Sequence, residues 1–386
     1  MVRYCLIGPT YPYRGGIAHY TTLLAQELRR QHEVLLLSFA QQYPTWLFPG
    51  RSDRDPSERP LQTDAEYLLD PLNPLSWRRA LRRLRQWQPD VVVMQWWHPF
   101  WAPAWAVLGQ GIRRLPSRPK LLFICHNVLP HEQGKLRLLL PLLTRLALAA
   151  GAGYIVHAET DGAILQRILP DVGARAPLCV TPHPTYAALG DVPPVALPWT
   201  LPADRPLLLF AGFVRPYKGL DVLLAALPAV LAQRPLHLLV AGEFWQGTAL
   251  YQEQIARLGI AEAVTLVDDY LPNELLAACI ARAAVVVLPY RSATQSGIIQ
   301  VAFGQGKPVI TTNVGGLAEV VTHEQTGLVV PPDDPTALAA AINRFFAEEL
   351  GPGMAARIGE ENGRFSWQRL IKQLNALSGY EADQAI

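Results

Sequence analysis

The sequence predicts an α/β protein made of two doubly wound domains, and three observations support this prediction. The chain has 386 residues, which is more than a single hydrophobic core usually serves. Half of the residues are hydrophobic and only 17% are charged, a balance that excludes a disordered chain. Short apolar runs alternate with helical patterns along the chain, as in a parallel sheet covered by helices on both faces.

The first half of the chain shows this alternation five times. Strands are expected at 3–8, 33–39, 90–95, 120–125 and 153–157, and helices at 17–30, 74–87, 101–113, 135–149 and 160–168. Residues 191–206 contain five prolines in sixteen residues, which is typical of a stiff linker. We therefore expect a first domain over 1–190 and a linker over 191–206.

The second half repeats the pattern. Strands are expected at 207–211, 236–241, 263–267, 284–288, 308–311 and 328–330, and helices at 219–232, 249–258, 272–282, 297–305, 316–322 and 335–349. These form a second domain over 207–364, followed by a closing helix within 365–386. Since ligands bind at the carboxyl ends of strands in such sheets, we expect a cleft between the two domains.

Cysteine usage and hydropathy bear on the compartment. The four cysteines are scattered without a C-x-x-C pair, which favours buried thiols over disulfides or a zinc site. The apolar stretch at the start is too short for a signal peptide, and no run of about 18 apolar residues occurs. A cytoplasmic protein is expected.

Charge is unevenly distributed between the halves. Residues 1–190 carry 21 Lys and Arg against 13 Asp and Glu, whereas residues 191–386 carry 13 against 19. The basic half suggests that one domain faces an anionic surface or substrate. No nucleic-acid recognition motif accompanies this charge, so no nucleic-acid partner is expected.

The segment "GFVRPYKGL" places Arg215 and Lys218 in a glycine-bounded turn between an expected strand and an expected helix. Helix amino termini and nearby cations attract anions, so the turn suits a diphosphate. Spacing alone equally allows two cations on a solvated turn. A second loop, "SATQSG", also opens a helix, where Ser296 and Gly297 could present backbone amides to a phosphate.

Several segments resemble the retaining family 4 (group 1) glycosyltransferases, which have the GT-B fold of two facing Rossmann-like domains. The second half contributes "GFVRPYKGLDVLLAAL", "GKPVITTNVGGLAEVV" and "TGLVVPPDDPTALAAAI". The first half contributes "YPYRGGIAHYTTLLAQELRRQHEV" and "HNVLPHE". The resemblance spans nearly the whole chain, with the motifs in the family's order.

The resemblance implies roles for individual residues. Arg215 and Lys218 match the basic pair that holds the donor diphosphate. Gly15 and Gly16 match the glycine loop of the first domain, and His126 matches the histidine near the transferred sugar. Ser296 and Gly297 match the loop whose amides meet the phosphate.

The chain departs from the family pattern at two positions. Family members usually carry two glutamates eight residues apart, and Ala293 and Val301 occupy those positions here. Since valine cannot accept a hydrogen bond from a ribose hydroxyl, another group must replace it. Gln295 and Gln300 are the nearby candidates.

The resemblance implies transfer of a sugar from a nucleotide-diphosphate donor, a UDP- or GDP-sugar, to a glycan or lipid-linked acceptor. No cofactor and no metal are expected, and the D-x-D spacing of Asp53 and Asp55 lies in a polar loop that favours solvent. Two alternatives stay open: a non-catalytic sugar-nucleotide-binding protein, which the missing glutamates allow, and a nucleotide-sugar 2-epimerase, which would need acids. The donor base, the sugar, the acceptor and the oligomeric state are not determined by the sequence.

Two segments bear on the acceptor. "WRRALRRLRQW", residues 77–87, predicts a helix with an apolar face and five arginines elsewhere. Such a helix either lies on an anionic membrane surface or carries a solvated basic face. "QWWHPFWAPAWAVLG", residues 95–109, is rich in tryptophan, which suits sugar rings, lipid interfaces or a core. Peripheral contact with an anionic membrane is therefore one hypothesis for the first domain.

Overall fold

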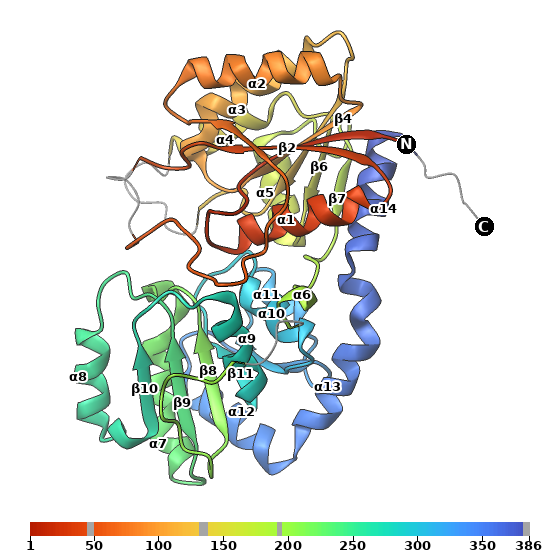
Figure 1. Cartoon of the computed structure of the whole chain (residues 1–386). Coiled ribbons are helices and arrows are strands. Elements are labelled where there is room, and N and C mark those ends of the chain that lie inside the picture. The colour runs from red at the N-terminus through yellow and green to blue at the C-terminus, as the bar shows by residue number, and fades with distance from the viewer. Residues whose placement is uncertain (45–49, 131–137, 191–194, 381–386) are drawn as a thin grey trace. The chain divides into compact units, whose positions relative to one another are not determined.

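The computed structural model describes residues 1–44, 50–130, 138–190 and 195–380, and it divides into two compact units. Unit 1 comprises Met1–Asp55, Pro60–Pro182 and Ser366–Ile386, and unit 2 comprises Pro56–Arg59 and His183–Phe365. Each unit contains one parallel sheet with helices around it (Figure 1). The prediction of two doubly wound α/β domains is confirmed.

Unit 1 is built on a seven-stranded sheet in the order β3-β2-β1-β4-β5-β6-β7. Its strands are β1 (Arg3–Ile7), β2 (Glu33–Phe39), β3 (Glu66–Leu69), β4 (Val91–Trp96), β5 (Lys120–Cys125), β6 (Gly153–Val156) and β7 (Leu178–Val180). Strands β1, β4 and β5 are apolar along nearly their whole length because both faces of the sheet are covered.

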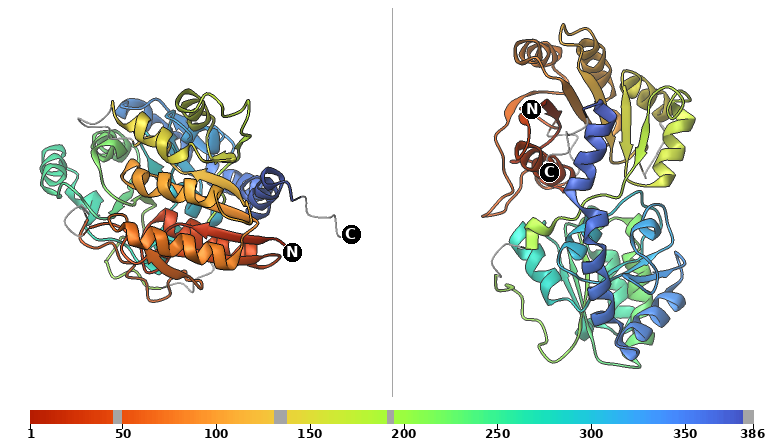
Figure 2. Two further views of the ribbon diagram at one scale, coloured as in Figure 1. Left: turned by 90° about the horizontal axis from the view of Figure 1, so that it is seen from above. Right: turned by 90° about the vertical axis from the view of Figure 1, so that its right-hand side faces the viewer.

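The helices of unit 1 connect these strands in turn. They are α1 (Gly16–Arg29), α2 (Pro74–Trp87), the 3-10 turn η1 (Pro99–Trp101), α3 (Ala102–Arg113), α4 (Leu140–Leu148), α5 (Glu159–Ile168) and the terminal α14 (Trp367–Ser378). Helix α2 packs on α3, α3 on α4 and α4 on α5, so these four form one layer. Helix α14, at the blue end of the described chain in Figure 2, contacts α1 and β5 instead.

Unit 2 has a six-stranded sheet in the order β10-β9-β8-β11-β12-β13. Its strands are β8 (Leu207–Ala211), β9 (His237–Ala241), β10 (Val264–Val267), β11 (Val285–Leu288), β12 (Val309–Thr312) and β13 (Gly327–Val330). Its helices are α6 (Ala187–Gly190), α7 (Leu220–Leu231), α8 (Ala249–Leu258), α9 (Asn273–Arg282), α10 (Gly297–Gly304), α11 (Leu317–Val320), α12 (Pro335–Ala347) and α13 (Leu350–Glu360). Short 3-10 turns are η2 (Pro216–Lys218), η3 (Ala261–Ala263) and η4 (Glu361–Phe365).

Local sequence signals explain where several helices begin. The side chain of Asn73 accepts a hydrogen bond from Leu75 N and precedes Pro74, and Asp334 accepts one from Ala337 N before Pro335. Ser366 caps α14 in the same way. A polar cap followed by proline satisfies orphan amides and presets the first helical turn.

The unit boundaries differ from the expected ones. The division falls between Pro182 and His183, inside the segment expected to belong to the first domain, and the terminal helix packs with unit 1. Residues 135–137 of the expected helix 135–149, 191–194 of the expected linker and 381–386 lie outside the described residues. Strands β3 and β7 and helix α13 were not expected from the sequence, because β3 and β7 are short edge strands and α13 contains three glycines and a proline.

Candidate functional site

The sheet order of unit 2 reverses between β8 and β11, which makes the carboxyl ends of these strands a topological switch point. Ligands of open α/β sheets bind at such a point. The segment 212–219 follows β8 and the segment 289–297 follows β11. The two stretches expected to bind phosphate therefore begin at neighbouring strand ends.

The glycines of the 212–219 turn allow close approach between backbone and side chains. Gly219 has φ +68, and an added Cβ would lie 2.0 Å from the carbonyl oxygen of Pro289. Gly212 has φ +97, and an added Cβ would lie 3.3 Å from Lys218 Nζ and 3.4 Å from Ile298 Cγ1. Glycine is thus required sterically at 219 and favoured by the positive φ at 212, and both the Lys218 ammonium and the Ile298 side chain of α10 adjoin Gly212.

Lys218 is a buried cation, with 9% of its surface exposed. Within the described residues, no carboxylate and no hydrogen-bond acceptor pairs with its ammonium, and its nearest aromatic partner is the ring of Tyr290, 5.2 Å away. Burial, together with the charge of Arg215, lowers the pKa of Lys218. A buried ammonium without an internal counter-ion is costly, so this position favours an anionic ligand.

Arg215 lies at the edge of an aromatic group that the sequence analysis missed. Its guanidinium carbon is 4.4 Å from the ring centroid of Trp245. Phe213 lies 5.3 Å from Trp245 and 5.7 Å from Tyr270, measured between ring centroids. These half-buried rings follow β8, β9 and β10, so they extend the switch point with a flat apolar surface.

The four residues predicted to bind the donor in and after the loop before α10 occupy different environments. Ser296 is the buried N-cap of α10 and Gly297 is its first residue, so their amides lie at the helix amino terminus. The amide atoms of Gln295 and Gln300 are buried without a hydrogen-bond partner in the described part of the chain. Gln300 and Gly304 are four residues apart and share one face of α10. An added Cβ at Gly304 would contact Ala187, so this face packs on α6. Ile298, whose side chain adjoins Gly212, lies on another face of α10.

The two positions that lack the family's glutamates are buried. Ala293 is 7% exposed and Val301 is 3% exposed. An added Cβ at Gly315 would lie 1.7 Å from the carbonyl oxygen of Ala293, so this loop packs closely on the segment before α11. Neither side chain can donate or accept a hydrogen bond, and the departure from the family pattern stands.

Arg291 organises the switch point and was not identified from the sequence. Its guanidinium donates to both carboxylate oxygens of Asp221, at 2.8 and 2.7 Å, and to Asp333 at 2.5 Å. It also donates to Pro216 O at 2.8 Å, and its backbone amide donates to Tyr217 O at 2.7 Å. These bonds raise the pKa of Arg291 and join the 212–219 turn to the loop after β11.

Unit 1 has its own switch point between β1 and β4, where His126 and Gln95 replace the arginine and lysine of unit 2. His126 Nε2 lies 2.7 Å from Gln95 Oε1, so the amide oxygen accepts from the imidazole N–H. The His126 ring contacts Tyr20 edge-on at 4.6 Å and lies 5.7 Å from His157. Burial lowers the pKa of His157 to about 4, although its hydrogen bond to Thr181 O opposes the shift.

The glycine loop of unit 1 leads into α1. Gly15 has φ +103 and open space where a Cβ would be, and Gly16 is the first residue of α1. His19 Nε2 lies 3.4 Å from Asp55 Oδ2, and Asp53 O accepts from Arg14 N. The D-x-D segment thus packs beside the glycine loop.

The two segments considered for the acceptor adopt different environments. Trp96, Trp101 and Trp105 are essentially fully buried, so the tryptophan-rich segment serves mainly as core. Helix α2 buries Trp77 and Leu84, whereas Arg78, Arg79, Arg82 and Arg85 are exposed. Arg83 is engaged in a bidentate hydrogen bond with Glu66.

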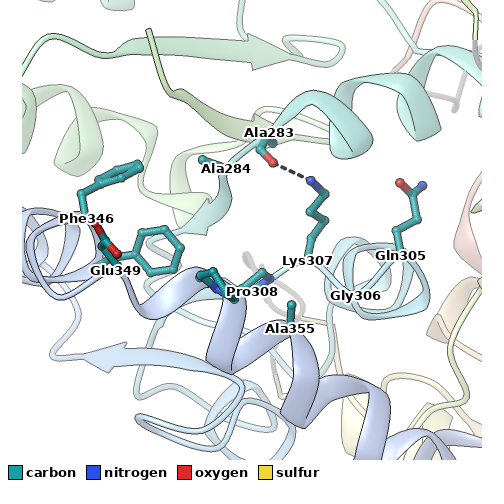
Figure 3. Close-up of a pocket in the computed structure, with 12 residues that line it drawn as sticks. Ala283, Ala284, Gln305, Gly306, Lys307, Pro308, Phe346, Glu349 and Ala355 are labelled. Atoms are coloured by element: carbon teal, nitrogen blue, oxygen red, sulfur yellow. Dashed lines mark hydrogen bonds between the residues drawn. The ribbon is translucent and has the colours of Figure 1, made fainter.

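A separate hollow of about 510 Å³ lies at the amino ends of β11 and β12, away from the switch point (Figure 3). Lys307 lines it and donates to the carbonyl of Ala283 at 2.9 Å. Lys307 is the other lysine of unit 2 whose pKa burial lowers, and this one has a hydrogen-bond partner.

Comparison with known families decides the classification. The model described as "Glycosyltransferase Family 4" matches residues 14–172, and the model "Glycosyl transferases group 1" matches residues 205–348. The chain belongs to the family 4 (group 1) glycosyltransferases. The resemblance expected from the sequence is confirmed, and the first match ends before the second begins.

Curated relatives within this family include D-inositol 3-phosphate glycosyltransferases. That of Streptomyces avermitilis is 34% identical over 180 residues, which are 43% of this chain and 38% of the relative. That of Nocardioides is 32% identical over 190 residues, 45% of this chain and 41% of the relative. The aligned part of the chain thus spans about two fifths of the length of these relatives.

Solved structures share the fold along the whole chain. Sucrose-phosphate synthase from Thermosynechococcus elongatus aligns with TM-score 0.71 and 22% identity, covering 98% of both chains. HepE of Anabaena in complex with UDP aligns with TM-score 0.69 and 18% identity, covering 97% of this chain and 100% of that one. The family 4 chain therefore has the expected fold of the GT-B glycosyltransferases. No helix in its described part is long and apolar enough to cross a bilayer.

Proposed function

We propose that this chain is a retaining glycosyltransferase that moves a sugar from a nucleotide-diphosphate donor, a UDP- or GDP-sugar, to a glycan or lipid-linked acceptor. One observation carries the proposal: the largely buried Lys218 has no counter-ion for its ammonium among the described residues, and both this ammonium and the Ile298 side chain in the first turn of α10 adjoin Gly212. A cation, helix amides and the neighbouring Arg215 together suit two linked phosphates.

The aromatic group beside Arg215 supports a nucleotide over a simple phosphate. Phe213, Trp245 and Tyr270 are half-buried and present flat rings to one side of the turn. A nucleobase stacked there would place its diphosphate toward Arg215 and Lys218. HepE of Anabaena, which shares the fold, has been solved with UDP and with UDP-glucose.

In the proposed reaction, the bond between the anomeric carbon and the diphosphate oxygen breaks, and the acceptor oxygen bonds to that carbon on the same face. The acceptor proton passes to the departing diphosphate oxygen, so no separate base is required. Arg215, Lys218 and the amides of residues 296 and 297 stabilise the negative charge that develops on the leaving group. This positive charge supplies what a metal ion would otherwise provide.

The remaining assignments follow from the resemblance. His126 would hydrogen-bond the transferred sugar, and Gly15 and Gly16 would let the backbone approach it. Gln95 Oε1 lies 2.7 Å from His126 Nε2 and fixes the orientation of the imidazole. Gln295 is the stronger of the two glutamine candidates, since Gln300 lies on another face of α10.

Thermal unfolding with UDP, GDP and ADP tests the donor site. A ligand at 100 times its dissociation constant stabilises the folded state by about 2.7 kcal/mol. We expect one nucleotide to raise the unfolding temperature of the wild type but not of Arg215→Ala/Lys218→Ala. The matched control is Arg257→Ala/Lys307→Ala, which removes an arginine and a part-buried lysine elsewhere in unit 2 and should still respond. An equal response of both double variants would contradict the site.

Donor turnover separates the proposal from its two alternatives. A glycosyltransferase consumes the donor mainly when acceptor is present, and an epimerase converts it without acceptor. A binding protein shows nucleotide stabilisation without turnover. Ala293 and Val301 stand where the family carries acids, which leaves an epimerase without its proton carriers in that loop.

A further inference from the structure

Helix α4 presents an apolar face to solvent. Leu138 and Leu139 precede it and are 83% and 51% exposed, and Leu142 and Leu146 within it are both 53% exposed. These side chains recur at helical spacing on the side opposite the buried Leu140, Thr144 and Leu148. Contiguous exposed leucines are unusual on a protein surface and mark an interaction site.

The surroundings of these leucines are strongly basic. Residues 71–130 and 138–150, which include α2, α3 and α4, contain ten Lys and Arg and a single acid, Asp90. Nine of the ten basic residues are exposed, among them Arg82, Arg113 and Arg145, and only Arg83 is half-buried. No ion pair with a described acid involves Arg145, which lies between Leu142 and Leu146 on the exposed face.

A groove of about 560 Å³ lies beside the exposed face, between α4 and α5. Its lining combines apolar side chains, including Leu138, Leu142 and Ile164, with Arg145 and Arg167. The groove therefore offers an apolar floor and two cations, one from each helix.

The direction of the helices orders these features. In a parallel α/β unit the helices run opposite to the strands, so their first turns lie toward the carboxyl edge of the sheet. Leu75 of α2 and Leu139 and Leu142 of α4 belong to that edge, and Leu146 lies one turn further along α4, next to Arg145. Exposed leucines with an arginine between them on one helix face fit a lipid interface, where apolar side chains enter the acyl boundary and arginines meet phosphates.

We propose that α4, with its four exposed leucines and the α4–α5 groove, is a docking surface for an anionic lipid bilayer. Charge complementarity selects this occupant: a second copy would bring two basic surfaces together, and a nucleic acid would leave the leucines in contact with water. The basic face of α2 adds attraction, but the leucines of α4 provide insertion. The proposal requires no assumption about the reaction that the chain catalyses.

Vesicle flotation of the full chain tests the surface. We expect binding to vesicles of phosphatidylcholine with phosphatidylglycerol and at least tenfold weaker binding to phosphatidylcholine alone. Leu142→Glu/Leu146→Glu should weaken binding at least tenfold, while the matched control Leu250→Glu, which changes a 72% exposed leucine of unit 2, should leave it unchanged. Arg145→Ala/Arg167→Ala should weaken it about fivefold for each charge removed, and Arg257→Ala should not.

Three results would overturn the proposal. One is a wild type that does not float with anionic vesicles, and another is a leucine variant that floats as well as the wild type. The third is evidence for a different occupant, either a dimer in light scattering that Leu142→Glu/Leu146→Glu dissolves or displacement of vesicles by a short RNA or DNA at equal charge. Thermal unfolding of each variant confirms folding, and nucleotide stabilisation should persist in all of them, which keeps this test separate from that of the donor site.

Discussion

The two units have the same architecture at their switch points but carry different side chains there. In both, a glycine turn joins the first strand to the first helix: Gly15 precedes α1, and Gly212 and Gly219 precede α7. Unit 2 adds Arg215 and the buried Lys218. Unit 1 places His126 and Gln95 at the neighbouring strand ends.

This difference separates two tasks. A buried ammonium near helix amides stabilises concentrated negative charge, as on a departing diphosphate. Imidazole and amide groups such as His126 and Gln95 instead provide directional hydrogen bonds, which suit sugar hydroxyls. If the proposed reaction is right, unit 2 provides the electrostatic part and unit 1 provides positioning.

Alanine substitution should distinguish the two glycine turns. Gly219→Ala would place a Cβ 2.0 Å from Pro289 O at φ +68, so a backbone must move, and we expect unit 2 to lose more than about 4 kcal/mol. Gly15→Ala has the unfavourable φ of +103 but meets nothing within 4 Å, so strain alone should cost about 1–3 kcal/mol. Chemical denaturation of both variants provides the measurement. A larger loss for Gly15→Ala would show that the turns are constrained in some other way.

Acid should destabilise unit 1 through His157. Its pKa is about 4 in the folded chain, below the ordinary 6.5, because burial disfavours the charged imidazole. Between these values the unfolded chain binds a proton that the folded chain does not. The contribution of neutral His157 to the free energy of unfolding is therefore complete above pH 6.5. It is lost as the pH falls to 4, and the total loss is about 3 kcal/mol.

The variant His157→Asn isolates this effect. The Asn amide can donate to Thr181 O as Nδ1 does, but it does not titrate. The stability difference between wild type and variant, measured at pH 7 and pH 4.5, should shrink at the lower pH. An unchanged difference would mean that His157 is accessible to a proton in the folded chain. His237→Asn in unit 2 provides a comparison at a less deeply buried imidazole.

The sequence was sufficient for the elements that position the site. Local sequence signals are strong for the buried strands, such as 207–211 and 120–125, because both faces of the sheet are covered and require apolar residues. The signal is also strong for the turn of Arg215 and Lys218, because its positive φ values favour glycine. Short edge strands such as β3 carry exposed polar residues and lack that signal.

Long-range partnerships were not accessible from the sequence. Arg291 binds Asp221 and Asp333, which are 70 and 42 residues away, and nothing local marks it. The aromatic group of Phe213, Trp245 and Tyr270 likewise assembles from three strand ends. Gln300 seemed a good ribose candidate by proximity in sequence, but helix periodicity directs it toward α6. Periodicity also cannot tell which apolar face of α4 lacks a neighbour.

Removing the buried charge of unit 2 should stabilise the unliganded chain. Lys218→Met keeps the length and apolar stem of the side chain but removes an ammonium that has no counter-ion among the described residues. We expect unit 2 to gain about 1 kcal/mol, or about 2–4 °C in unfolding temperature, while nucleotide stabilisation is lost. The trade-off would identify Lys218 as a residue kept for binding at a cost in stability.

The pH dependence of this gain follows from the lowered pKa of Lys218. Between that lowered value and the ordinary 10.5, the unfolded chain carries a proton that the folded chain has released, so the stability of the wild type rises with pH. The advantage of Lys218→Met should therefore shrink as pH rises through this window. Lys307→Met is the matched control: its pKa is also lowered by burial, but its loss leaves Ala283 O unpaired, so no gain is expected. An equal gain in unfolding free energy in both variants would mean that any buried lysine in unit 2 is destabilising. The contrast between the switch points of the two units would then have no basis in stability.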